Sequence, residues 1–167
     1  LTLTGDTGNV VFTGTVGADA NLELGAVSIV SAADVTASST FEAASLVQTA
    51  GTGTTTLTDN VTTTAAAGVN ITAANINLDG LTIAASGDGV ARFNGATVLD
   101  GATVITTTGT GAITFTSTLG SVADEDNTLT LTGDTGNVVF TGTVGADANL
   151  ELGAVSIVSA ADVTASS

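Results

Sequence analysis

Apolar and polar side chains alternate along short segments of this chain, and clusters of glycine, asparagine and aspartate separate the segments. In residues 75–79 (NINLD) two apolar side chains fall on one face and three polar ones on the other, because side chains of a strand alternate at every residue. Ile113 and Phe115 share a face in the same manner. The pattern predicts β-strands at residues 9–16, 21–24, 26–30, 54–58, 69–78, 90–93, 96–99, 103–107 and 112–119.

The clusters between these segments are typical of tight turns, since Gly, Asn and Asp tolerate positive φ angles. Helical periodicity competes only over residues 42–50, which are too few for a stable helix, and we expect strand or loop there. The chain is therefore predicted to be all-β. Turns are expected at residues 5–8, 17–19, 79–80, 87–89, 94–95, 100–101 and 109–111.

One long segment of the sequence occurs twice. Residues 129–167 are identical to residues 1–39, at an offset of 128 residues. Such self-similarity is the signature of repeat architectures. We therefore expect residues 1–128 to be one complete repeat unit, residues 129–167 to begin the next, and the whole to be an uncapped slice of a tandem array. A duplicated segment in an artificial chain is the alternative.

The composition favours one all-β fold over others. Aromatic residues make up 3% of the chain, and Trp and Tyr are absent, whereas an immunoglobulin-like sandwich is usually built around a large aromatic residue. A right-handed parallel β-solenoid needs only small, β-branched, Leu and occasional Phe residues inside each coil. With roughly 20 residues per coil, a repeat has about six coils and advances about 29 Å along the axis. We expect each repeat to contain a whole number of coils, because a fractional coil would rotate the next copy about the axis and direct its apolar residues towards water.

Two segments resemble a known kind of repeat. Residues 111–120 (GAITFTSTLG) and 8–17 (GNVVFTGTVG) resemble the repetitive regions of giant bacterial surface proteins, namely filamentous-haemagglutinin-like and autotransporter-associated β-strand repeat proteins. The resemblance is one of repeat style over the whole chain. It implies a right-handed β-solenoid shaft that is exported, displayed on the cell surface and often used in adhesion. It supplies no functional residues to carry over.

The charge excludes several functions. The formal net charge is −15, with one Arg and neither His nor Cys. Nucleic-acid binding depends on Lys and Arg, so no nucleic-acid partner is expected. No run approaches the roughly 20 apolar residues of a membrane span, so no membrane insertion is expected in this segment. Without His or Cys, catalysis would rest on carboxylates, and these are too scattered for a glycosidase pair. We expect no enzymatic activity.

The densest acidic cluster is a candidate metal site. Asp124, Glu125 and Asp126 are followed by Asn127, and oxygen ligands of this kind bind Ca²⁺. The alternative is a solvated loop. Residues 75–80 (NINLDG) superficially match the start of a helix-loop-helix calcium loop, but the twelfth position is Ser86 and the alternation predicts a strand. No cofactor is required by any feature of the sequence.

Two other features carry expectations. Arg92 is the one basic side chain, and we expect it to pair with a nearby carboxylate such as Asp88 or Asp100. Thr-x-Thr pairs recur along the chain, which is typical of outward strand positions and is also found in ice-binding solenoids. Their irregular spacing favours the first interpretation. The pairs are Thr2/Thr4, Thr13/Thr15, Thr54/Thr56, Thr62/Thr64, Thr106/Thr108, Thr114/Thr116 and Thr116/Thr118.

These observations predict a structural protein. We expect the shaft of an extracellular filament or cell-surface stalk, built from copies of this unit in tandem or end to end, with neighbouring fibres joined through divalent cations. Two alternatives stay open. One is a Ca²⁺-dependent adhesin repeat of the β-sandwich type, and the other is a Thr-rich solenoid that binds ice, carbohydrate or another ligand.

Overall fold

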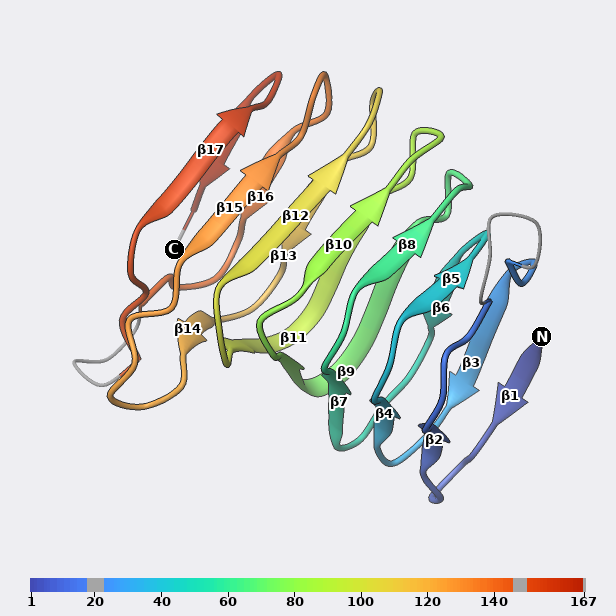
Figure 1. Ribbon diagram of the computed structural model, residues 1–167. Helices are drawn as coiled ribbons and strands as arrows, with labels where there is room; N and C mark the ends of the chain where they lie inside the picture. Colours follow the sequence, from blue (N-terminus) through green and yellow to red (C-terminus); the bar gives the residue numbers. More distant parts are fainter. Residues whose placement is uncertain (18–22, 146–149, 167) are drawn as a thin grey trace.

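The computed structural model describes residues 1–17, 23–145 and 150–166, and this part of the chain is all β-strand and connection, without a helix. The fold is a parallel β-solenoid of about seven turns (Figure 1). The strands are β1 (Thr2–Thr4), β2 (Val10–Phe12), β3 (Val27–Ser31), β4 (Val35–Ala37), β5 (Phe41–Ala43), β6 (Leu46–Gln48), β7 (Thr54–Leu57), β8 (Val61–Thr63), β9 (Val69–Leu78), β10 (Thr82–Ala85), β11 (Ala91–Leu99), β12 (Thr103–Thr107), β13 (Ile113–Phe115), β14 (Leu119–Ser121), β15 (Leu129–Thr132), β16 (Val138–Phe140), β17 (Val155–Ser159) and β18 (Val163–Ala165).

Each coil passes over three faces. The first face holds β1, β3, β6, the first half of β9, the first half of β11, β13, β16 and β18 in that order. The second face holds β2, β4, β7, the second halves of β9 and β11, and β14. These two faces form one twelve-stranded sheet, and the third face is the six-stranded sheet of β5, β8, β10, β12, β15 and β17. All the pairings are parallel, as successive coils of one winding require.

The winding is right-handed. In Figure 1 the chain rises along the near third face, returns along the far first face, and advances from the blue end towards the red end. Parallel strands joined by a crossover have this hand almost without exception. The fold prediction of a right-handed parallel β-solenoid is confirmed.

Side chains that point inward form columns along the axis. On the first face Ile71, Phe93 and Phe115 occupy one column, and on the third face Ile83, Ile105 and Leu131 occupy another. Every one of these residues is at most 1% exposed. Aligned residues lie between 19 positions (Ile29 and Gln48) and 27 positions (Thr132 and Ser159) apart, so the coils vary in length.

Several strand predictions are confirmed. Residues 69–78 and 103–107 form β9 and β12, and residues 42–50 contain the strand β6 rather than a helix. The predicted turn at Asn94 and Gly95 is wrong, because these residues lie inside β11, where the register shifts between Asn94 and Ala96. Gly95 is required there because a Cβ would overlap the Ala73 carbonyl of the previous coil. The predicted strand 21–24 and turn 17–19 lie mostly outside the described residues.

The expectation of a whole number of coils per repeat is wrong. β1 lies on the first face, whereas β15, which has the same sequence, lies on the third face. Five full coils and two further strand positions separate them, so one repeat contains five and two-thirds coils. At about 4.8 Å per coil the repeat advances about 27 Å instead of 29 Å. The second copy is thereby rotated by one face about the axis. Its apolar side chains still point inward, because all three faces direct apolar residues into the core.

Candidate functional site at the junction of the two copies

The place where the second copy of the repeat meets the first is the site that bears most directly on a structural role. On the third face β15 pairs with β12, and on the first face β16 pairs with β13. On the second face Val144 forms a bridge with Leu119. The strand stack therefore crosses from one copy to the next on all three faces without an interruption.

Backbone hydrogen bonds run across this junction on every face. On the first face Ile113 N–H donates to Asn137 O at 2.9 Å, and on the second face Leu119 N–H donates to Thr143 O at 2.9 Å. On the third face the ladder between β12 and β15 crosses the junction, next to the bond from Thr103 N–H to the carbonyl of Thr128, the last residue of the first copy. These bonds are the same in kind as those between coils inside the first copy. Because backbone groups pair without regard to side chains, these bonds require the two strand edges to have matching lengths and registers.

A ladder of aromatic rings passes through the junction. The rings of Phe93 and Phe115 stack with centroids 5.0 Å apart, and the rings of Phe115 and Phe140 stack with centroids 5.7 Å apart. Phe93 and Phe115 belong to the first copy and Phe140 to the second. Aromatic pairs contribute about 0.5–1.5 kcal/mol beyond the area that they bury. The ladder therefore binds the second copy to the core of the first.

Glycines allow the two copies to approach closely at the corners of the coil. A Cβ at Gly136 would overlap the carbonyl of Gly111, one at Gly142 would overlap the carbonyl of Ser117, and one at Gly153 would overlap the carbonyl of Asp126. In the first copy Gly14 and Gly25, the counterparts of Gly142 and Gly153, would meet no atom within 4 Å. The need for glycine thus appears only where another coil is stacked against the segment.

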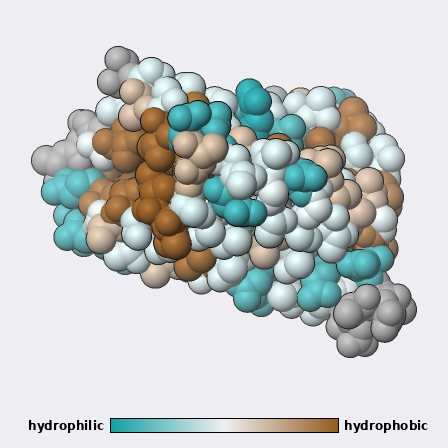
Figure 2. Space-filling view, turned by 90° about the horizontal axis from the view of Figure 1, so that it is seen from above, coloured by the Kyte–Doolittle hydropathy of each residue, from teal (hydrophilic) through white to brown (hydrophobic). Residues whose placement is uncertain are grey.

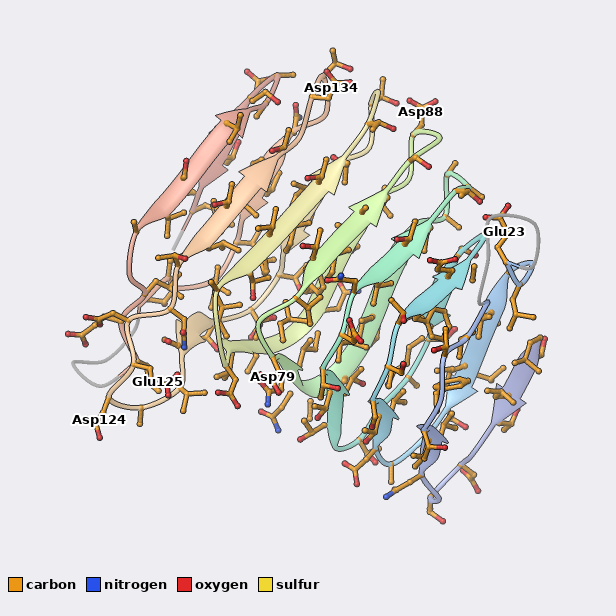
Figure 3. All side chains as sticks on the ribbon, viewed as in Figure 1. Glu23, Asp79, Asp88, Asp124, Glu125 and Asp134 are labelled. Atoms are coloured by element: carbon orange, nitrogen blue, oxygen red, sulfur yellow. The ribbon has the colours of Figure 1, made fainter. Side chains whose placement is uncertain are left out.

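Aspartates at the turns bond to the backbone of adjacent coils. Asp134 Oδ2 accepts from the N–H of Gly109 at 2.9 Å across the junction, and Asp88 Oδ1 accepts from the N–H of Thr110 at 2.8 Å. Both aspartates have positive φ, 49° and 61°, which Asp tolerates better than most residues. Figure 3 places Asp88 and Asp134 along one edge of the stack. These carboxylates hold turns together, although the sequence alone presents them simply as charge.

The predicted calcium ligands lie in the loop between β14 and β15. Asp124, Glu125 and Asp126 are exposed, and Figure 3 shows the first two at a different edge from Asp88. Asn127 Nδ2 donates to Glu125 Oε2 and to Ser121 Oγ, each at 2.9 Å. Within residues 1–17, 23–145 and 150–166 no three acidic side chains gather into a group that could hold a metal ion. The calcium site stays a prediction.

The basic side chain has a different partner from the one expected. Arg92 is exposed on the outer side of β11, and its Nε donates to Asn94 Oδ1 at 2.9 Å. Asn94 Nδ2 in turn donates to Asn70 Oδ1 of the previous coil at 3.0 Å. The expected ion pair with Asp88 or Asp100 is not formed. The reason is geometric, since both aspartates lie at corners of the coil while Arg92 lies within a strand.

Outward threonines do not form the regular columns of an ice-binding surface. On the third face one outward column runs Glu42, Thr62, Ala84, Thr106 and Thr132. Other threonines point inward and are buried, namely Thr55, Thr63, Thr97, Thr103 and Thr107. The β-sandwich alternative is excluded by the parallel solenoid.

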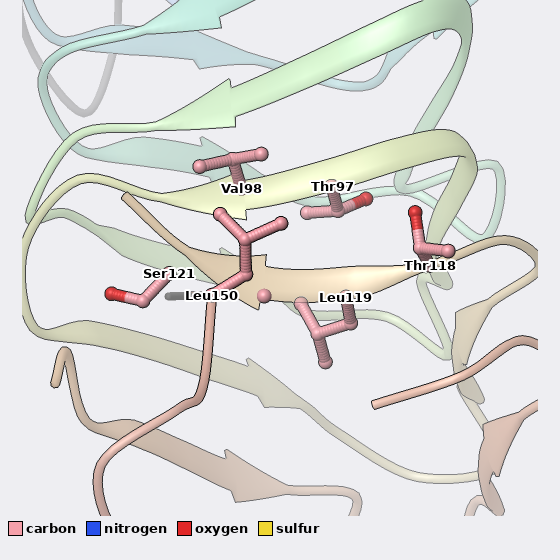
Figure 4. Close-up of a pocket in the computed structure, with 7 residues that line it drawn as sticks. Thr97, Val98, Thr118, Leu119, Ser121 and Leu150 are labelled. Carbon is pink, nitrogen blue, oxygen red and sulfur yellow. The ribbon is translucent and has the colours of Figure 1, made fainter. Parts of the chain in front are cut away.

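A small hollow beside the junction has an uncharged lining. It is formed by β14, by the second half of β11 and by Leu150 of the second copy (Figure 4). Its lining residues are Thr97, Val98, Thr118, Leu119, Gly120, Ser121 and Leu150. None of these side chains offers acid–base or nucleophilic chemistry beyond a hydroxyl, and the hollow lies where the two copies pack together.

Comparisons with protein-family models, with curated proteins and with solved structures found no match for this chain. No helix in the described part of the chain is long and apolar enough to cross a membrane. The functional conclusion therefore depends on the geometry of the junction.

Proposed function

We propose that this chain belongs to the shaft of an extracellular filament or cell-surface stalk, built from tandem copies of one solenoid repeat. The observation that carries the proposal is the junction, where β15 and β16 of the second copy extend the two sheets of the first. A chain of separately folded domains would instead close each core before the next begins. The proposal includes no catalytic activity.

The role of such a shaft is mechanical. Pulling along the axis acts on every coil-to-coil interface, where backbone hydrogen bonds on three faces and a buried apolar column resist separation together. The buried column contains the stacked Phe93, Phe115 and Phe140. Since the chain has no Cys, this resistance is noncovalent. Adhesion through other parts of a longer protein fits the same architecture.

The length of the particle tests this proposal. Each added 128-residue copy is expected to lengthen a single rod by about 27 Å, because each coil advances about 4.8 Å. Small-angle X-ray scattering and negative-stain imaging of chains with one, two and three copies measure this increment. Hinged lobes, or a cross-section that grows with copy number, would contradict a continuous shaft.

Divalent cations are proposed to draw neighbouring shafts together. Among the described acidic residues only Glu42 lies in a strand, and the rest lie at corners and loops, where most of them are exposed. A net charge of −15 on 167 residues keeps such rods apart at low salt, and Ca²⁺ relieves the repulsion. Light scattering should rise with Ca²⁺ and fall with chelator. A variant with Asp124→Asn, Glu125→Gln and Asp126→Asn carries three fewer repelling charges and should need less Ca²⁺, and scattering that ignores both Ca²⁺ and chelator would refute the idea.

A further inference from the structure

The two identical 39-residue segments lie on different faces of the solenoid. β1 and β3 lie on the first face, and their counterparts β15 and β17 lie on the third. β2 and β4 lie on the second face, and their counterparts β16 and β18 lie on the first. Val16 pairs with the third face, and its counterpart Val144 pairs with the second. All five landmarks have moved by one face in the same direction.

Each segment keeps its internal geometry during this move. Leu3 pairs with Ile29 and Leu131 with Ile157, and in both copies the register shifts at the following residue. Val10 pairs with Val35, as Val138 pairs with Val163. The segment is therefore the same folded unit in both places, turned as one body about the axis.

The cause is the number of strand positions in a repeat. From β1 to β14 the chain makes seventeen passes over a face, counting β9 and β11 twice and the bridge at Val16 once. Seventeen is one fewer than the eighteen that six coils of three would need. The following copy therefore begins one face early, on the third face instead of the first.

The free edge at the start of the chain matches one side of the junction. In the second copy the edge formed by β15, β16 and Val144 is covered by β12, β13 and β14. In the first copy the same residues form an open edge, so that Leu3 and Val10 are half-buried whereas Leu131 and Val138 are completely buried. The strands that complement this edge are already known from the junction.

We propose that the edge formed by β1, β2 and Val16 receives the β12, β13 and β14 strands of another copy of the repeat, in the register of the internal junction, so that each copy is turned by one face relative to the one before it. This rests on the proposed function as a tandem shaft. A given surface group returns to the same face only after three copies, which comprise seventeen coils and span about 82 Å. Arg92, the one cation of each copy, is thereby presented on all three faces in turn.

Engineered disulfides test this rotation by one face. The chain has no Cys of its own, so only the introduced pair can form a disulfide. The test uses an extended chain in which residues 1–128 precede the full 167 residues. Thr106 pairs with Thr132 in the present junction, and Thr132 is the counterpart of Thr4. Paired residues of adjacent strands lie about 4.8 Å apart, which suits a disulfide. Thr106→Cys in the first copy and Thr4→Cys in the second should lose both free thiols on mild oxidation.

In the matched control, the two cysteines are placed where they would be adjacent only if the second copy were not rotated relative to the first. There the second copy would begin on the first face against β13, so Thr114→Cys in the first copy would cross-link with Thr2→Cys or Thr4→Cys in the second. We expect both thiols to stay free in these variants. If the Thr114→Cys variants cross-link and the Thr106→Cys variant does not, the proposed rotation is wrong, but the shaft is still continuous. If neither design cross-links in the extended chain, while Thr106→Cys and Thr132→Cys do cross-link in the 167-residue chain, both the rotation and the continuous shaft are wrong.

Discussion

Residues 1–39 and residues 129–167 have one sequence and two environments. In the first copy the early strands are open and the later ones covered, so Val10 is half-buried while Val35 is 2% exposed. In the second copy the order is reversed, with Val138 fully buried and Val163 54% exposed. The same side chains thus serve as core in one copy and as edge in the other, according to which coil is stacked against them.

The comparison separates two kinds of information. The register inside the segment is the same in both copies, including the shift that follows Leu3 and Leu131. The face that the segment occupies is different. Because the internal geometry survives a change of neighbours, it is set locally. Because the face changes without any change of sequence, it is set by the strands that the segment is packed against.

The largest expected difference between the copies is at the phenylalanines. Phe140 stacks on Phe115, whereas its counterpart Phe12 is half-buried and meets Phe41 edge to face with centroids 5.4 Å apart. Phe140→Ala should lower the free energy of unfolding of its coil by about 3–5 kcal/mol. Phe12→Ala should cost less than half as much. Urea unfolding and hydrogen exchange of amides in the same coil measure both, and equal losses would contradict the ladder.

Glycines at the corners give the next largest difference. Gly142→Ala should destabilise its coil by about 1–3 kcal/mol, because the new methyl group meets the Ser117 backbone. Gly14→Ala, the same substitution in the first copy, should be neutral or slightly stabilising, since no atom lies within 4 Å and the unfolded chain loses entropy. Thermal unfolding of the two variants is the measurement. A larger loss from Gly14→Ala would show that the first copy is packed against another coil in solution.

A third pair should show the opposite sign. Val35 is 2% exposed and Val163 is 54% exposed, so here the first copy is the covered one. Val35→Ala should cost about 1–2 kcal/mol and Val163→Ala less than about 0.5 kcal/mol. Hydrogen exchange of the surrounding amides reports both changes. If the second copy were instead the more sensitive at every position, a general weakness of that end would explain the data better than burial.

The smallest expected difference concerns a turn aspartate. Asp134→Ala removes the acceptor of the Gly109 N–H bond and should cost about 1 kcal/mol. Its counterpart Asp6 has a similar positive φ, 55° compared with 49°. Asp6→Ala therefore controls for the backbone strain of placing Ala at a position with positive φ. The difference between the two losses in urea unfolding isolates the bond across the junction. No difference would mean that water replaces it at no cost.

The open ends of the stack differ from its middle in surface character. Val155 and Val163 belong to the last strands and are 41% and 54% exposed, whereas their counterparts Val27 and Val35 in the first copy are at most 2% exposed. Figure 2 shows apolar side chains gathered towards the end of the particle that carries the second copy. The apolar surface lies where the inward columns are uncovered, in keeping with stacking by further coils.

Much of the fold was predictable because long strands alternate clearly. Residues 69–78 and 103–107 have enough alternating positions to predict their full extent. The sequence does not predict the three-residue strand β8, and it leaves most of β5 as strand or loop, because Phe41-Glu42-Ala43 and Val61-Thr62-Thr63 offer a single alternation each. The break at Asn94 and Gly95 resembles a turn in sequence, and only the coil beneath makes it a shift within a strand.

The candidate site was predictable only in part. The exact repeat indicates that two copies meet, but not how, and nothing in the sequence distinguishes the corner aspartates Asp88 and Asp134 as hydrogen-bond acceptors from the other acidic residues. Their partners lie 22 and 25 residues away, in other coils. Spacing along the chain could not reveal these contacts, because the coils vary in length.

The sequence by itself determined the alternation of inward and outward side chains, the parallel solenoid and the register within each 39-residue segment. These depend on the side-chain period of a strand and on turns whose residues are close in the chain. Tertiary structure alone decided which face each copy occupies and which of its residues are buried. The three faces accept the same small and β-branched residues, so local sequence cannot distinguish them, and the number of preceding strands makes the choice.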